Sequence, residues 1–116
     1  MPTFSLERCN LFLAEDNDYI RSVLDNLLRH LSFENITVAE NGADAIDYFK
    51  TLCGPQGASK GHAIDLVISD LVMSPVNGLL LLRWLRTAKE SPNRFMPFIM
   101  LSGAADNEYV HAARDL

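Results

Sequence analysis

The stretch Asp65–Gly78, DLVISDLVMSPVNG, contains the pattern on which the fold assignment depends. The run from Leu66 is typical of a strand buried in a sheet, yet it ends on a carboxylate at Asp70. Turn-forming residues follow at once, with Pro75 and Asn77 before the next apolar run. A carboxylate is costly to bury without a partner, so we expect Asp70 to lie at the end of its strand, at an edge of the sheet.

Three other apolar runs have the length of strands, and each is followed by a segment with helical periodicity. The expected strands are Cys9–Ala14, Asn35–Ala39, Ile64–Asp70 and Pro97–Ser102. The expected helices cover residues 20–31, 42–52, 78–85 and 107–116, with Asn41 and Asn77 at the helix starts. Alternating strands and helices predict an α/β sandwich, in which a parallel sheet has helices on both faces.

The composition favours one compact domain, because the chain has 116 residues of which 48% are hydrophobic. The formal net charge of −5 argues against direct binding of nucleic acid, which requires clustered basic side chains. No apolar run approaches the ~20 residues that a membrane-spanning helix needs, and the N-terminus lacks the pattern of a signal peptide. We therefore expect a cytoplasmic protein with no membrane contact, in which Cys9 and Cys53 are reduced thiols.

Polar side chains lie at the ends of three expected strands. Glu15 and Asp16 follow the first strand, Asp70 ends the third, and Ser102 ends the fourth. Because parallel strands place their carboxyl ends at one edge, these side chains are expected to gather there. Carboxylates without His or Cys favour a hard cation such as Mg²⁺, and a carboxylate can attack phosphorus to form an acyl phosphate. The pattern indicates phosphoryl transfer, with Asp70 as the most deeply placed carboxylate and the candidate nucleophile.

A simpler interpretation of each residue remains open. Asp16 and Asp18 could cap the first helix, and Asp70 could be a turn former. Ser102 could be an ordinary hydroxyl at the end of a strand. What favours a site is the joint placement of acids and a hydroxyl at three separate strand ends.

Four blocks of sequence carry a resemblance to a known family. They are LFLAEDN at 11–17, NGADAI at 41–46, DLVISDLVMSPVNGLLLLRWLR at 65–86 and FIMLSGAAD at 98–106. Together they resemble the receiver (REC) domain of two-component response regulators. The resemblance implies a flavodoxin-like, three-layer α/β sandwich with strand order 2-1-3-4, in which the family's fifth strand is absent from this chain. It also implies a single receiver domain over residues 1–116, truncated after the fourth helix.

The resemblance implies a role for each residue of the acidic site. Asp70 would accept a phosphoryl group from a histidine kinase or a histidine phosphotransfer protein. Asp16 would bind Mg²⁺ together with Asp70 and the backbone carbonyl of Val72, and Glu15 would complete the acidic pair. Ser102 would be the switch hydroxyl that hydrogen-bonds the phosphoryl group. The domain would assist only its own phosphorylation and dephosphorylation, so it would not be an enzyme toward other substrates.

Two departures from the family pattern leave a second hypothesis open. Ser74 stands where the family usually has proline, with Pro75 one place later. The chain also ends before the fifth strand, which in the family carries a phosphate-binding lysine. The alternative is a receiver-like module that is not phosphorylated and works by interaction or dimerisation. A phosphatase with an aspartyl nucleophile is disfavoured, because Val72 stands where its second acid is expected.

A missing fifth strand would leave the fourth strand at the edge of the sheet. Its backbone groups and the side chains of Phe98 and Met100 would then lack cover, and an exposed apolar edge is a template for pairing. We therefore predict a homodimer formed through the edge of the fourth strand or through the last helix.

Overall fold

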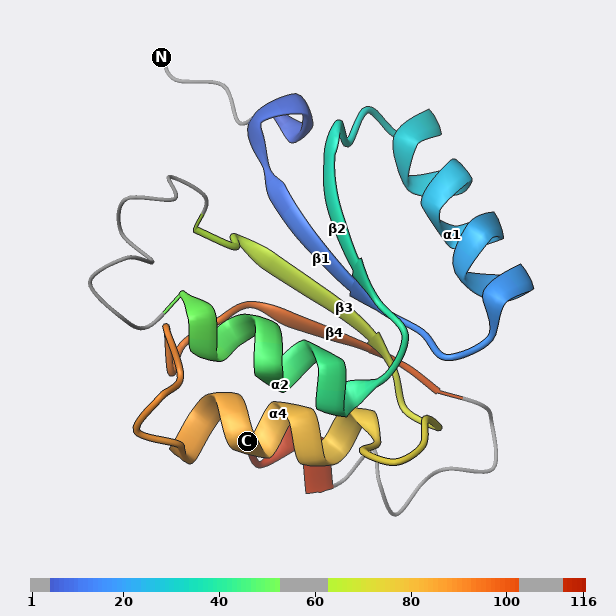
Figure 1. The fold of residues 1–116 in the computed structure, drawn as a ribbon. Coiled ribbons are helices and arrows are strands. Elements are labelled where there is room, and N and C mark those ends of the chain that lie inside the picture. The colour runs from blue at the N-terminus through green and yellow to red at the C-terminus, as the bar shows by residue number, and fades with distance from the viewer. Residues whose placement is uncertain (1–4, 53–62, 103–111) are drawn as a thin grey trace.

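The computed structural model describes residues 5–52, 63–102 and 112–116 of the chain. Within these ranges the elements, in chain order, are η1 (Leu6–Arg8), β1 (Asn10–Ala14), α1 (Asp18–His30), β2 (Asn35–Ala39), α2 (Gly42–Thr51), β3 (Leu66–Asp70), α4 (Gly78–Thr87) and β4 (Phe98–Leu101). Figure 1 shows the strands side by side, with α1 on one face of the sheet and α2 and α4 on the other. This arrangement is the three-layer α/β sandwich expected from the sequence.

The four strands form one parallel sheet in the order β2-β1-β3-β4. β1 lies between β2 and β3, so Leu11 pairs with Ile36 on one side and with Leu66 on the other. The strand order implied by the resemblance is therefore confirmed. Because parallel strands need crossover connections, the helices return the chain across the faces of the sheet, and the carboxyl ends of the strands share one edge.

The larger hydrophobic core lies between the sheet and the helices α2 and α4. Phe12 of β1 is fully buried and packs against Phe49 of α2, with ring centroids 4.7 Å apart. Leu81 and Leu85 of α4 belong to the same buried cluster. Trp84 lies beside Phe49, with ring centroids 6.5 Å apart, and thus serves helix packing. Each buried side chain of this size stabilises the fold by roughly 1.5–3 kcal/mol relative to an exposed one.

The opposite face of the sheet is covered less completely. A smaller buried cluster on this face consists of Cys9, Leu11, Leu13, Leu28 and Phe33, with Leu24 of α1 packed against it. Other apolar side chains remain accessible, since Leu27 of α1 is 53% exposed and Ile99 of β4 is 47% exposed. Within the described residues, α1 therefore shields only part of this face.

β2 begins at Asn35 as the sequence pattern predicted, but the other three strands begin slightly later. β1 begins at Asn10 and β3 begins at Leu66, each one or two residues after the expected start. β4 begins at Phe98, because Pro97 has no amide hydrogen to donate and contributes only its carbonyl, which accepts from the Val67 amide at 2.9 Å. The apolar pattern alone does not reveal which backbone groups pair.

Some of the sequence expectations fall on parts of the chain that the structure does not describe. The first half of the helix expected over 107–116, residues 107–111, lies outside the described residues. Residues 112–114 are helical, in agreement with that expectation. Among the described helices, none combines the length and the apolar character that crossing a membrane requires.

Candidate functional site

Three carboxylates converge at the carboxyl edge of the sheet. Glu15 and Asp16 directly follow β1, and Asp70 is the last residue of the neighbouring strand β3. Each of the three side chains offers one oxygen atom, and these oxygens all lie within 4.8 Å of one another. The parallel pairing of β1 with β3 produces this cluster, because it places both strand ends side by side.

Glu15 is the most deeply buried of these carboxylates, at 3% exposure. Asp70 is only half-buried and Asp16 is exposed, so the prediction that Asp70 would lie deepest is wrong. The reason is the backbone pairing beyond the end of β1. The amide of Glu15 donates to the carbonyl oxygen of Ala39 at 3.1 Å, which keeps Glu15 in line with the sheet.

Burial changes the acidity of Glu15. Removal from water, together with a hydrogen bond to Asp70 and the negative charge of Asp70, raises the pKa of the Glu15 carboxyl from 4.5 to about 7. Near neutral pH Glu15 is therefore protonated in part of the molecules, whereas an exposed glutamate would be fully ionised. A bound cation would favour release of this proton, because it stabilises the charged carboxylate.

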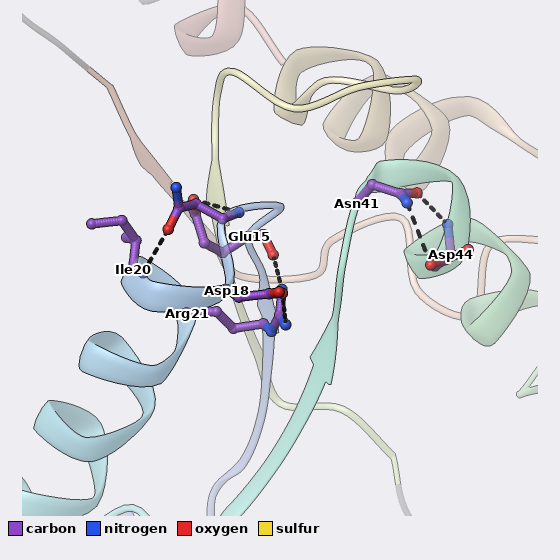
Figure 2. A network of polar contacts seen from close by, with 7 residues as sticks. Glu15, Asp18, Ile20, Arg21, Asn41 and Asp44 are labelled. Carbon is purple, nitrogen blue, oxygen red and sulfur yellow. Dashed lines mark hydrogen bonds and ion pairs between the residues drawn. The ribbon is translucent and has the colours of Figure 1, made fainter.

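The turn between β1 and α1 leaves the Asp16 side chain free of a capping role. Asn17 is the N-cap of α1, and its side-chain oxygen accepts from the amide of Ile20 at 2.9 Å (Figure 2). The open alternative that Asp16 or Asp18 caps this helix is therefore wrong. The amide of Asn17 also donates to Oε1 of Glu15 at 3.3 Å, which ties the turn to the acidic cluster.

The loop after β3 folds back tightly onto Asp70, the last residue of that strand. The amide of Gly78 donates to the carbonyl oxygen of Leu71 at 2.9 Å. A Cβ atom at Gly78 would lie 2.3 Å from the carbonyl oxygen of Asp70 and 2.7 Å from the sulfur of Met100, so glycine is required here. Asn77 caps α4 by accepting from the Leu80 amide at 2.8 Å, as the sequence predicted.

The early part of this loop contains the remaining predicted ligand. Val72 lies two residues beyond the end of β3 and is 68% exposed, so solvent can reach this position. The peptide bond between Ser74 and Pro75 is cis, at the place where the sequence departs from the family pattern. Gly42, at the start of α2, also lies close to this loop. Its amide donates to the carbonyl oxygen of Val76 at 3.1 Å, which anchors the loop to α2.

Ser102 lies at the same edge of the sheet. Asp70 pairs with Leu101 in the register of β3 and β4, and the amide of Leu71 donates to the Leu101 carbonyl oxygen at 2.9 Å. Ser102 follows directly and is exposed. Ser69 was not singled out in the sequence, but it is fully buried and its hydroxyl donates to the carbonyl oxygen of Asp70 at 2.9 Å.

The donor set fits a hard divalent cation. Within the described residues the cluster contains carboxylate oxygens alone, and oxygen ligands suit Mg²⁺ better than a softer metal such as Zn²⁺. The mixture of one buried, one half-buried and one exposed carboxylate leaves one side of the cluster open to solvent. An incoming group could reach a bound cation from that side.

The amino-acid sequence matches the response regulator receiver domain family over residues 11–116. It is 31% identical over 109 residues to the 3',5'-cyclic-nucleotide phosphodiesterase regA of Dictyostelium discoideum, covering 93% of this chain and 12% of that protein. It is 32% identical over 108 residues to the alkaline phosphatase synthesis transcriptional regulatory protein SphR of Synechococcus elongatus, covering 93% of this chain and 39% of that protein. The chain therefore spans well under half the length of these relatives.

Solved structures share the fold. A response regulator receiver protein from Pseudomonas putida aligns with a TM-score of 0.70 at 24% identity, covering 93% of this chain and 78% of that one. The bacteriophytochrome response regulator RtBRR aligns with a TM-score of 0.73 at 24% identity, covering 92% of this chain and 63% of that one. The sheet order and the sequence match agree with these likenesses. The chain belongs to the response regulator receiver domain family.

Proposed function

We propose that this receiver domain is a phosphoacceptor, in which Asp70 takes a phosphoryl group from a histidine kinase or a histidine phosphotransfer protein with the help of Mg²⁺. The observation that carries this proposal is the convergence of Glu15, Asp16 and Asp70 within 4.8 Å at the carboxyl edge of the sheet. Membership of the receiver family supports it, because phosphorylation of a carboxylate at this edge is the function that the family resemblance implies.

Asp70 is the best candidate nucleophile because it is the partly accessible carboxylate at the end of a strand. One of its oxygens would form a bond to phosphorus while the P–N bond of the phosphohistidine donor breaks and its electron pair returns to the imidazole. Mg²⁺, when bound, would offset the charge on the phosphoryl oxygens. Asp16 would hold the cation, Glu15 would support it after losing its proton, and the Val72 carbonyl would supply a further oxygen.

Ser102 would complete the acceptor site from the neighbouring strand. Its exposed position directly after β4 allows the hydroxyl to turn toward a phosphoryl group on Asp70 and donate a hydrogen bond to it. In this proposal residues 1–116 act as one receiver domain that transforms no other substrate. We place it in the cytoplasm, where ATP supplies the phosphoryl group that a histidine kinase passes on.

A second candidate function is a receiver-like interaction module that is not phosphorylated. The observation that favours it is that large apolar side chains, including Leu27 of α1 and Ile99 of β4, are exposed on the protein surface. Such a surface suits a protein partner, including a second copy of the chain. The two candidate functions differ in one measurable property: only the phosphoacceptor takes up a phosphoryl group, and it requires Asp70 to do so.

Phosphorylation by acetyl phosphate tests the proposal. We expect intact-mass spectrometry to show addition of one phosphoryl group to the wild-type protein in the presence of Mg²⁺, and loss of the signal after chelation of the metal. Asp70→Asn should abolish the addition, whereas the control Asp25→Asn on α1 should leave it intact. Equal labelling of Asp70→Asn and wild type would contradict the assignment, and no labelling of a folded wild-type protein would favour the interaction module.

A further inference from the structure

Arg21 is an unusual surface residue of α1, because its side chain is only 16% exposed. Its Nη1 atom donates to the carbonyl oxygen of Glu15 at 2.9 Å, and its Nη2 atom pairs with the carboxylate of Asp18. Figure 2 shows the guanidinium reaching from the helix to the end of β1. The backbone of Arg21 is fixed as well, since its amide donates to the Asn17 carbonyl oxygen at 2.8 Å.

The carbonyl that Arg21 holds belongs to the peptide that joins Glu15 to Asp16. The amide of Glu15 is held by Ala39 at 3.1 Å, and Oε1 of Glu15 is held by the amide of Asn17 at 3.3 Å. The guanidinium holds the carbonyl oxygen of Glu15 in turn, and so fixes the plane of the peptide that follows. Because that plane sets the direction in which the Asp16 backbone leaves the strand, Arg21 constrains both carboxylates of the acidic pair.

We propose that Arg21 is a positioning residue for the metal centre, holding Glu15 and Asp16 in the geometry that binds Mg²⁺. This inference rests on the proposed function, since it requires that the acidic cluster binds the metal. Residues that orient metal ligands from outside the coordination shell typically change metal affinity by 10- to 100-fold when they are replaced. Arg21 acts through a backbone carbonyl, so we expect an effect near the lower limit, about tenfold.

The same helix supplies a matched control. Arg29 makes the same two kinds of contact at the other end of α1, with Nε donating to Asp25 at 3.2 Å and Nη1 donating to the carbonyl oxygen of Glu34 at 3.3 Å. Its side chain is 48% exposed, and it lies away from the acidic cluster. Replacement of Arg29 thus removes a comparable ion pair and a comparable carbonyl contact without touching the metal site.

The test compares Mg²⁺ affinity and amide exchange in the full 116-residue chain. Isothermal titration with MgCl₂, well below the melting temperature, should give a dissociation constant about tenfold higher for Arg21→Met than for wild type, and an unchanged constant for Arg29→Met. The dissociation constant of Arg21→Lys should lie between those of wild type and Arg21→Met. Lysine keeps the positive charge, but one ammonium group cannot reproduce the planar fork that contacts two oxygens. In the metal-free protein, the amides of Asp16 and Asn17 should exchange faster in Arg21→Met than in Arg29→Met.

The outcomes separate this inference from the function on which it rests. Wild-type affinity in Arg21→Met, together with loss of binding in Asp70→Asn, would overturn the positioning role and leave the metal site intact. Equal losses in Arg21→Met and Arg29→Met would also overturn it, because the effect would then follow helix stability. If Arg21→Met does not fold, Arg21→Lys decides by the same comparison. A wild-type protein that binds no Mg²⁺ would overturn the metal centre and the inference with it.

Discussion

Glu15 combines two properties that both disfavour its ionised form, deep burial and a position beside another acid. Its pKa in the folded state is raised to about 7 from the ordinary value of 4.5, first by burial and then by Asp70. Between these two values the folded protein holds a proton that the unfolded chain has released. The contribution of this group to stability is therefore fully present below pH 4.5 and is lost as the pH rises through about 7.

We predict that Glu15→Gln removes this pH dependence, because glutamine keeps the shape of the protonated acid and cannot ionise. Without Mg²⁺, the free energy of unfolding of the variant should match wild type at pH 4 and exceed it at pH 8 by on the order of 1 to 3 kcal/mol. Urea denaturation across this pH range measures the difference. Asp18→Asn, whose side chain is 88% exposed in wild type, is the control and should not show this gain. Parallel pH profiles for Glu15→Gln and wild type would contradict the prediction.

The helices and strands illustrate which features a sequence pattern can predict. Asn41 and Asn77 were recognisable as helix starts, and each does cap its helix through a side-chain oxygen. The start of α1 was ambiguous because four polar residues follow β1, and only the fold shows that Asn17 is the cap. Strand starts depended on which backbone groups find partners, and the pattern of apolar side chains does not contain that information.

The loop between β3 and α4 gives a prediction about packing. Gly78→Ala would place a methyl group 2.3 Å from the carbonyl oxygen of Asp70, so the end of β3 or the start of α4 must move. We expect the free energy of unfolding to fall by about 1–3 kcal/mol, as for other overpacked sites, and the affinity for Mg²⁺ to fall as Asp70 shifts. Denaturant titration and calorimetry measure the two effects. An unchanged denaturation midpoint would contradict the close approach of the two segments.

In the domain as a whole, the order of the strands places the acidic cluster at the carboxyl edge of the sheet. This part of the site could therefore be predicted from the sequence. Strand ends in a parallel sheet must share an edge, so the convergence of Glu15, Asp16 and Asp70 followed from the order of the elements. The relative depth of these acids did not follow, because burial depends on how the neighbouring strands pair. The reach of Arg21 was missed for a similar reason, since contacts of a long side chain depend on the tertiary fold.

The exposed apolar side chains of the described residues predict self-association of the 116-residue chain. In the described sheet β4 pairs with β3 alone, and Ile99 of β4 is 47% exposed beside this free edge. Exposed apolar edge strands pair readily with other chains. We expect the sedimentation coefficient to rise with protein concentration, and Ile99→Lys to weaken the association. A monomer that persists at tens of micromolar, with slow amide exchange along Phe98–Leu101, would contradict this prediction.

Chemical trapping of the phosphorylated residue gives the clearest decision on the acceptor. The protein is incubated with acetyl phosphate and Mg²⁺, treated with borohydride, which reduces an acyl phosphate to the alcohol, and then digested for peptide mass spectrometry. If Asp70 is the phosphoacceptor, homoserine appears at position 70 and the other acidic residues, including Glu15 and Asp16, remain unchanged. Homoserine at another aspartate, or an unmodified Asp70 in a protein that has taken up phosphate, would contradict the proposed function.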